Sequence, residues 1–221
     1  LNYQDKATCW TMLFAAYVFS NTPPPYNTTT EIHKINKYFI ERDIWTKDEL
    51  GYFMENNYHN IAIQAINSKD YTWAEKFLNK YKNSLPPDTP DHTYNTCLAT
   101  IRFKQKRFED SLKYISRLKI DNVMSRTNVA TLNIRCYYEL GYYEEAHSGA
   151  EALRQFHIKN KVLPYNLKKN LLGFAKYVVK IIKCKALQKR FPEEIYIKAK
   201  NDPSISSKPW VLDKMQELMN Q

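Results

Sequence analysis

The chain has 221 residues and a formal net charge of +10, with 43% apolar and 25% charged residues, which is typical of globular proteins rather than disordered or membrane-spanning ones. Its 4 glycines stand singly, so the sequence contains no glycine-rich phosphate loop, no dinucleotide fingerprint and no G-x-S-x-G nucleophile elbow. Motif-based nucleotide-binding and serine-hydrolase sites are therefore excluded.

The four cysteines, Cys9, Cys97, Cys136 and Cys184, lie far apart and form no C-x-x-C pair. Disulfide frameworks and zinc sites need closer or more numerous cysteines, so we expect four reduced, mostly buried thiols, which favours the cytoplasm. The first residue is leucine, so the chain is expected to be a fragment or a processed product. The most apolar stretch, residues 8–19, is shorter than the roughly 20 residues that cross a bilayer and predicts no membrane span.

The N-terminal quarter of the sequence predicts helices separated by a linker. Residues 4–20 carry apolar side chains at helical spacing, and the proline run within 21–25 ends that helix because proline removes backbone donors. Thr30 is predicted to cap a second helix. Thr46 and Glu49 have the spacing of a capping box, which predicts a third helix. This third helix is expected to carry Leu50, Phe53 and Met54.

A repeat begins near Tyr58. Three segments align on a small residue, Ala74, Ser111 and Ala146, with separations of 37 and 35 residues. Each small residue follows an aromatic residue by three positions: Tyr71, Phe108 and Tyr143. A period of about 34 residues, with a helix, a short turn and a second helix, is typical of a solenoid of helical hairpins. The small residue lets the two helices of a hairpin approach closely, and the aromatic residue fills the gap at the turn.

These residues resemble tetratricopeptide repeats (TPR). The closest match is 137–146, which includes the turn glycine Gly141, and the stretch 104–112 aligns with the turn and second helix of another repeat. Pro86 stands where the TPR consensus closes the second helix. The sequence departs from the consensus at three positions, with Asn133 for leucine, Arg102 for an aromatic residue and Lys106 for glycine.

Three further stretches, 71–77, 85–87 and 208–212, are similar to the C-terminal region of uncharacterised bacterial TPR proteins. After residue 160 the repeat fades. Pro164 is expected to open a long helix to about Cys184. One face of it is apolar, with Leu171, Ala175, Val178 and Ile182. A final helix is expected to begin near residues 207–209 and to present Trp210, Val211, Met215 and Leu218.

The predicted fold is all-α, a TPR-like α-solenoid of helical hairpins with helical caps at both ends. Residues 1–54 form the N-terminal capping helices, 55–160 about three hairpins, and 161–221 a basic set of C-terminal capping helices. Such caps are needed because the open end of a solenoid core must be covered.

The TPR resemblance implies a non-catalytic scaffold that binds a peptide or partner helix in a groove, the partner being another protein or an upstream domain of the same chain. By this alignment the groove is lined by His59, Ile63, Thr96, Thr100, Phe103, Asn128, Thr131, Arg135 and Tyr138. The carboxylate-clamp version of the groove is disfavoured, since only Asn128 and Arg135 could contribute to it. Alternatively, the protein's own flanking helices fill the groove.

The net positive charge is confined to residues 151–200, which contain 13 Lys and Arg and 3 Asp and Glu. Lys169, Lys176, Lys180 and Lys183 fall on one stripe of the long helix, opposite its apolar face. The basic 154–200 segment could therefore meet nucleic-acid phosphates, anionic lipid or an acidic partner. The alternative is a solvated helix face. Lysines outnumber arginines here by 11 to 2, which disfavours the forked contacts to bases or phosphates that arginine makes. Aromatic residues are few on the stripe, which disfavours single-strand stacking.

No residue pattern predicts catalysis, a metal or a cofactor. Glu144 and His147 have a spacing used in di-iron sites, but such sites need a second motif, which the sequence lacks, so both are expected on exposed helix surface. Cys97 and Cys136 lie on the apolar side of their helices and are expected in the core. An enzyme subunit whose chemistry resides upstream of Leu1 is the remaining alternative.

Overall fold

The computed structural model describes residues 12, 28–87, 90–118, 123–160 and 163–221. These residues are mostly helical, and among them the one extended pairing is an isolated bridge between Lys47 and Phe53. The all-α prediction is therefore confirmed. The helix predicted at residues 4–20 lies, apart from residue 12, outside this part of the chain.

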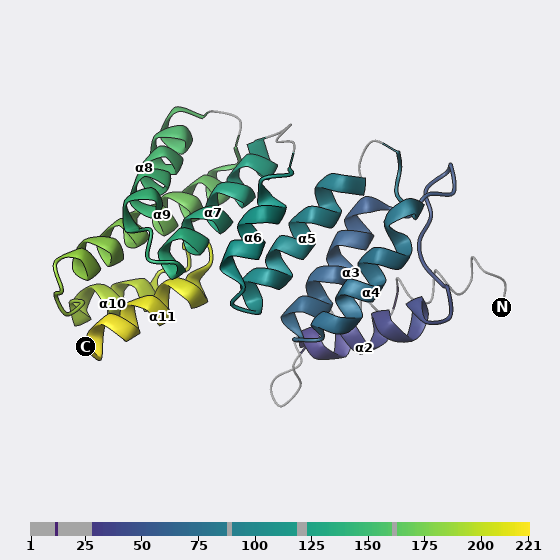
Figure 1. Cartoon of the computed structure of the whole chain (residues 1–221), viewed down its shortest axis with the longest axis horizontal. Helices are drawn as coiled ribbons and strands as arrows, with labels where there is room; N and C mark the ends of the chain where they lie inside the picture. The colour runs from purple at the N-terminus through teal and green to yellow at the C-terminus, as the bar shows by residue number, and fades with distance from the viewer. Residues whose placement is uncertain (1–11, 13–27, 88–89, 119–122, 161–162) are drawn as a thin grey trace. The chain divides into compact units, whose positions relative to one another are not determined.

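The chain divides into two compact units, residues 1–118 and 119–221. The helices of the first unit are α2 (Thr28–Ile40), α3 (Glu55–Asn67), α4 (Tyr71–Tyr81), the short 3₁₀ helix η1 (Lys82–Ser84), α5 (Pro90–Lys104) and α6 (Phe108–Ile115) (Figure 1). Those of the second are α7 (Val123–Glu139), α8 (Tyr143–Lys159), α9 (Tyr165–Ala186), α10 (Glu193–Asn201) and α11 (Lys208–Met219). The boundary falls inside the range 55–160 that the sequence assigns to the hairpins.

The three predicted hairpins are present, and the same turn closes each of them: α3 to α4, α5 to α6, and α7 to α8. The turn residue has positive φ in every case, 63° at Lys69, 60° at Lys106 and 82° at Gly141. The next amide donates to a carbonyl five residues back, from Asp70 to Ala65, from Arg107 to Arg102 and from Tyr142 to Tyr137. This is the Schellman arrangement, which satisfies the last carbonyls of a helix.

The small residue of the repeat lies in the core of each hairpin. Ala74, Ser111 and Ala146 are all fully buried. Ser111 remains compatible with this site because its hydroxyl donates to the Ala99 carbonyl across the hairpin at 2.8 Å. The periodicity in the sequence thus corresponds to a repeated local structure.

The second turn has a lysine, Lys106, at positive φ, a backbone conformation that glycine adopts with less strain. At positive φ the Cβ of a non-glycine residue crowds the neighbouring peptide group, so Lys106→Gly is expected to raise the free energy of unfolding by about 0.5–1 kcal/mol. The reverse change at the third turn, Gly141→Lys, is expected to lower it by a similar amount. Urea denaturation of both variants checks the pair, and a loss of stability in Lys106→Gly would show that its side chain outweighs the backbone strain.

The prediction that a helix begins at Thr46 is wrong. The Asp48 carboxylate accepts hydrogen bonds from the amides of Leu50 and Tyr52, both at 2.9 Å, and Gly51 follows with φ of 87°. These bonds occupy amides that a helix start would need, so the chain turns back and α3 begins only at Glu55. As a result Leu50 is exposed and Phe53 is buried. A smaller correction concerns Thr30, which lies in the first turn of α2, since that helix begins at Thr28.

An aromatic cluster forms the core of the first unit around Phe53. The Phe53 ring stacks on Trp45 with 4.5 Å between centroids and meets the rings of Tyr58, Phe77 and Tyr81. The Tyr58 hydroxyl donates to the Leu78 carbonyl at 2.8 Å, and burial raises the pKa of this phenol. The cluster fastens the 46–54 turn onto α3 and α4.

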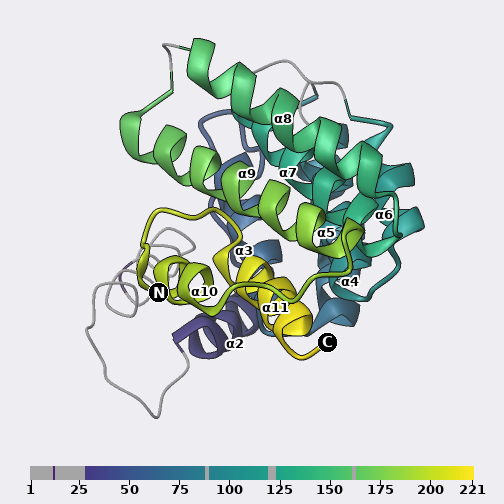
Figure 2. The ribbon, with the colours of Figure 1, turned by 90° about the vertical axis from the view of Figure 1, so that its left-hand side faces the viewer.

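In the second unit the long helix α9 lies alongside α8 (Figure 2). Its predicted apolar residues Leu171, Ala175, Val178 and Ile182 are all buried, which confirms that face. The final helix is confirmed as well, because α11 begins at Lys208 and buries Val211, Met215 and Leu218. Of the cysteines in the described ranges, Cys97 and Cys136 are buried and Cys184 is half-buried, all as free thiols. Burial raises the pKa of the Cys97 thiol to about 12.

A polar cluster fixes α11 to the end of α7. The Glu139 carboxylate accepts from the Trp210 indole at 2.6 Å and pairs with the Lys214 ammonium at 3.1 Å. Lys214 also pairs with Glu217 at 2.6 Å. Burial by itself lowers the pKa of Lys214, but the hydrogen bonds to Glu217 and Glu139 together outweigh it, so the pKa is raised and the ammonium stays charged.

Candidate functional site

Five of the predicted groove residues lie in the first unit, on α3 and α5, which pack against each other. His59, Ile63, Thr96 and Thr100 are half-buried, whereas Phe103 is buried and packs against Phe108. Both threonine hydroxyls donate to carbonyls one turn earlier on α5, so their remaining surface is largely methyl and oxygen lone pairs. Burial lowers the pKa of His59, which keeps its imidazole neutral at pH 7.

The other four predicted groove residues lie on α7 in the second unit. Asn128 is exposed, but Thr131 and Tyr138 are buried. The Tyr138 ring meets Trp210 of α11 edge-on at 5.4 Å, so the protein's own last helix covers this position. Arg135 is half-buried with its Nε donating to the Thr131 carbonyl, and burial lowers its pKa to about 10. Of these four predicted groove residues, therefore, Asn128 is the one that is exposed.

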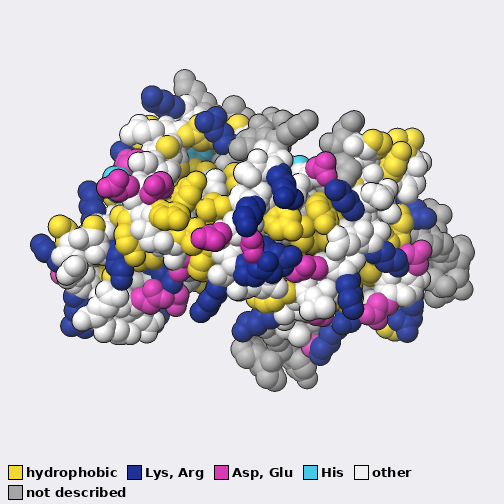
Figure 3. All heavy atoms as spheres, viewed as in Figure 1, with side chains coloured by type: hydrophobic (Ala, Val, Ile, Leu, Met, Phe, Trp, Pro, Cys, Tyr) yellow, Lys and Arg dark blue, Asp and Glu magenta, His cyan; other side chains and the backbone are white. Residues whose placement is uncertain are grey.

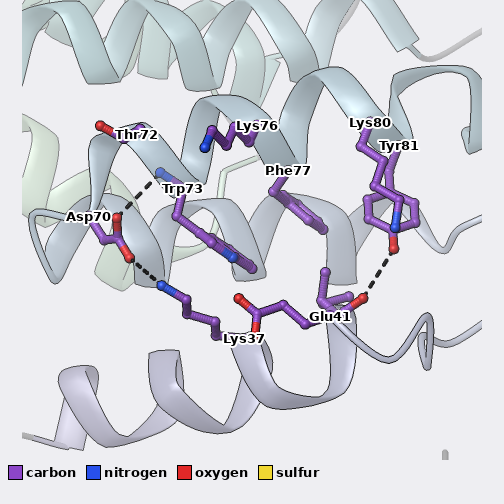
Figure 4. A pocket seen from close by; sticks show the side chains of 10 residues that line it. Lys37, Glu41, Asp70, Thr72, Trp73, Lys76, Phe77, Lys80 and Tyr81 are labelled. Atoms are coloured by element: carbon purple, nitrogen blue, oxygen red, sulfur yellow. Dashed lines mark hydrogen bonds and ion pairs between the residues drawn. The ribbon is translucent and has the colours of Figure 1, made fainter.

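A pocket that sequence reasoning did not find lies between α2 and α4 in the first unit. It has a volume of about 440 Å³, and Figure 4 shows Lys37 of α2 and Glu41, the residue after the end of α2, facing the aromatic side chains of α4. Its lining comprises Lys37, Ile40, Glu41, Asp70, Thr72, Trp73, Lys76, Phe77, Lys80 and Tyr81.

The floor of the pocket is an aromatic row along α4. Trp73 and Phe77 stack with 5.4 Å between centroids and an interplanar angle of 4°, and Phe77 meets Tyr81 at 5.4 Å. Phe77 and Tyr81 are buried, so the half-buried Trp73 presents most of the accessible aromatic surface. The pocket thus has a rigid apolar floor, since each ring is held by the next.

Charged groups at fixed positions rim this floor. At one end the Asp70 carboxylate caps α4 through the Trp73 amide and accepts from His33 at 3.1 Å and Lys37 at 3.3 Å. Burial favours the neutral acid, but these hydrogen bonds outweigh it and hold the pKa of Asp70 below its usual value. At the other end the hydroxyl of Tyr81, together with Asp43, raises the pKa of Lys80. Both groups are charged at neutral pH, and Lys76 is exposed between them.

The sequence does contain a signal for this pocket. Trp73, Phe77 and Tyr81 recur every four residues, with Lys76 and Lys80 on the adjacent positions of the same helix. Spacing alone attributes these aromatic residues to packing inside the hairpin. The pocket exists because α2, more than 30 residues earlier, lies across that row, as the Lys37–Asp70 pair shows.

The lysine stripe of α9 is confirmed as a surface feature. Lys169, Lys176 and Lys183 are exposed and Lys180 is half-buried. In α8 Glu144 is exposed and His147 half-buried. Within the described ranges no group of three or more His, Cys, Asp and Glu side chains is arranged to hold a metal ion, and no helix there is long and apolar enough to cross a bilayer.

A buried histidine in the second unit makes stability depend on pH. His157 is fully buried, its Nε2 lies 3.5 Å from the Thr127 hydroxyl, and its Nδ1 is buried without a hydrogen-bond partner. Burial, reinforced by the charge of Lys168, lowers the pKa of His157. As the pH falls, the imidazole of His157 is therefore protonated first in the unfolded chain, at a pKa of about 6.5, and in the folded chain only at lower pH.

The contribution of neutral His157 to the free energy of unfolding of the second unit is accordingly expected to be fully present above pH 7. As the pH drops below about 6.5, the free energy of unfolding is expected to fall by up to about 1.4 kcal/mol per pH unit. Replacing the imidazole with a neutral amide in His157→Gln should flatten this dependence between pH 7 and 5. Hydrogen exchange of α8 peptides, corrected for the intrinsic exchange rate at each pH, measures it. A slope that His157→Gln leaves unchanged would assign the effect to another group.

Comparison of the chain with protein-family models, with curated proteins and with solved structures finds no match.

Proposed function

We propose that this chain is a non-catalytic interaction scaffold built as a TPR-like solenoid, and that it binds a short segment of another protein. The repeated hairpin supports the proposal, because the same left-handed turn and buried small residue recur three times. Repeats of this kind present long helix faces to a partner. In this view α2 caps the hairpins of the first unit, and α9, α10 and α11 cap the hairpin of the second.

The observation that carries the proposal is the pocket between α2 and α4. Its Trp73 surface offers a flat apolar contact, and Lys76 and Lys80 stand beside it. A partner segment with an apolar or aromatic side chain next to a carboxylate would bury the first on Trp73 and pair the second with these lysines. At neutral pH Asp70 is a carboxylate and Lys80 an ammonium, because the pKa of the first is lowered and that of the second is raised. Both pKa values lie far from neutral pH, which suits ion pairing better than proton transfer.

The groove expected on the first helices of the hairpins is a second surface for the same function. His59, Ile63, Thr96 and Thr100 keep partial exposure on adjacent helices of the first unit. A peptide or helix from another protein, or from an upstream domain of this chain, is the expected occupant there.

Site-specific photo-crosslinking of the full chain in its source cells tests both surfaces. A photoreactive residue at Thr72, on the pocket rim, is expected to capture one defined protein, and Trp73→Ala to reduce that adduct about 30-fold, as loss of a central aromatic contact does at about 2 kcal/mol. Lys76→Glu, an exposed change that spares the core, should also reduce it.

The same photoreactive residue at exposed Glu109 on α6 serves as the control. A photoreactive residue at Ile63 probes the groove in the same way. An adduct there but not at Thr72 would move the binding site to the groove. Adducts no stronger at either position than at Glu109 would contradict the scaffold proposal.

A further inference from the structure

The exposed face of α9 forms a straight row of positive charge. Lys169, Lys176, Lys180 and Lys183 project from one side of the helix, opposite the buried Phe174, Val178 and Ile181. At 1.5 Å rise per residue the row is about 21 Å long. We call these four lysines the α9 basic face.

The charges of this face are not neutralised by the protein. In the first unit basic side chains pair with carboxylates, for example Lys34 with Glu31 and Lys82 with Asp91, both at 2.7 Å. In the second unit carboxylates pair with other basic residues: Glu139 and Glu217 pair with Lys214, and Glu151 pairs with Arg154. Within the part of the chain that the structure describes, none of the four lysines forms an ion pair with a carboxylate. In the described ranges, therefore, no carboxylate neutralises these charges, of which those on Lys169, Lys176 and Lys183 are exposed and that on Lys180 is half-buried.

Further basic residues follow the C-terminal end of α9. Lys189 and Arg190 are exposed in the loop after it, and Lys198 and Lys200 are exposed on α10. Lys and Arg side chains stand at the left-hand edge of Figure 3, where Figure 1 places the end of α9 and α10. The second unit thus extends its positive surface beyond one helix.

We propose that the α9 basic face binds the phosphate backbone of a nucleic-acid duplex without reading its sequence. Four ammonium groups along about 21 Å span roughly six base pairs at 3.4 Å each, so they can follow one stretch of backbone. The row contains lysine and no arginine, which supplies point charges rather than the planar forks that read base edges.

Two other anionic partners fit this face less well. On α9 the exposed large apolar residue is Tyr165, at the first position of the helix, and Leu187 follows its last. Between them the basic face has no exposed apolar anchor of the kind that inserts into a membrane interface. No exposed aromatic ring lies within the row either, so it lacks the stacking platform that single strands use.

The test is the salt dependence of binding by the full chain to a labelled 24-base-pair duplex, as DNA and as RNA, followed by fluorescence anisotropy. Four neutralised phosphates predict that log K falls with log salt with a slope of about −3.6 for the DNA duplex. Lys176→Glu with Lys180→Glu is expected to weaken binding at least tenfold at low salt and to make the slope shallower by about 2. Both lysines lie on the outer side of α9, so circular dichroism should show an unchanged fold.

The matched control is Lys34→Glu with Lys113→Glu, which changes the net charge equally at exposed positions of the first unit. Equal loss in this control would show a general charge effect and overturn the proposal. Absence of duplex binding at low salt would overturn it too, as would binding to vesicles of anionic lipid in preference to both duplexes.

Discussion

Gly173→Ala is expected to lower the free energy of unfolding of the second unit by about 3 kcal/mol, at the upper end of what overpacking costs. A Cβ on Gly173 would lie 2.2 Å from the backbone oxygen of Ser204, which is far inside van der Waals contact. The loop between α10 and α11 crosses α9 at this point, and the Ser206 amide donates to the Asn170 carbonyl at 2.9 Å. Since the obstacle is backbone rather than a flexible side chain, the loop must move away from α9.

The result is informative because helix propensity predicts the opposite sign. Alanine in a helix is more favourable than glycine by about 1 kcal/mol, so Gly173→Ala would stabilise α9 if the loop were absent. Gly149→Ala on α8 is the matched control, since its Cβ would meet only the Ile134 side chain, at 3.0 Å. We expect the control to change stability by less than about 1 kcal/mol. Urea denaturation measures both, and equal stability of Gly173→Ala and the wild type would show that the loop does not rest on α9.

Phe53→Ala is expected to destabilise the first unit by about 4 kcal/mol, because it removes the ring that four other aromatic residues surround. Phe53 has no exposed surface, and its amide also donates to the Ser84 carbonyl at 2.7 Å, which ties the 46–54 turn to η1. Loss of the ring should therefore loosen the turn as well as the core. Hydrogen exchange in peptides of α3 and α4 reports the change.

Leu50→Ala is the control for this turn. Leu50 is 82% exposed, so its truncation is expected to change stability by no more than about 0.5 kcal/mol. The pair also distinguishes the observed turn from the helix that the Thr46 capping box predicts, which places Leu50 and Phe53 one turn apart on the same side. Similar losses in both variants would favour the helix.

The two units suggest a division of roles for the chain. The pocket lined by Trp73 and Lys76 lies within the first unit, and the α9 basic face lies within the second. Their proposed ligands differ in how steeply their binding responds to salt. A row of phosphate contacts weakens steeply with ionic strength, whereas the pocket combines an aromatic contact on Trp73, which salt does not weaken, with a single carboxylate beside the lysines. Variants in one unit are thus expected to leave binding by the other unchanged.

The sequence by itself determined the features that repeat over short distances. Helical periodicity gave the buried face of α9, with Leu171 and Val178, and it gave the lysine row opposite. The small residues Ala74, Ser111 and Ala146 marked where paired helices meet, because only a small side chain fits there. All of these depend on residues within one or two turns of each other, and the 3.6-residue period of a helix is readable at that range.

Only the tertiary structure decided what long separations bring together. The Asp48 carboxylate took the amides of Leu50 and Tyr52, which in the helix predicted from Thr46 would donate to carbonyls four residues back, and Phe53 packs into the aromatic core in the resulting turn. The pocket depends on α2 lying across α4, and the covering of Tyr138 on α7 depends on Trp210. Trp210 bonds to Glu139 across 71 residues of chain. No periodic pattern encodes such a contact, because it arises from the shapes and hydrogen-bond needs of elements that meet only once the chain has folded.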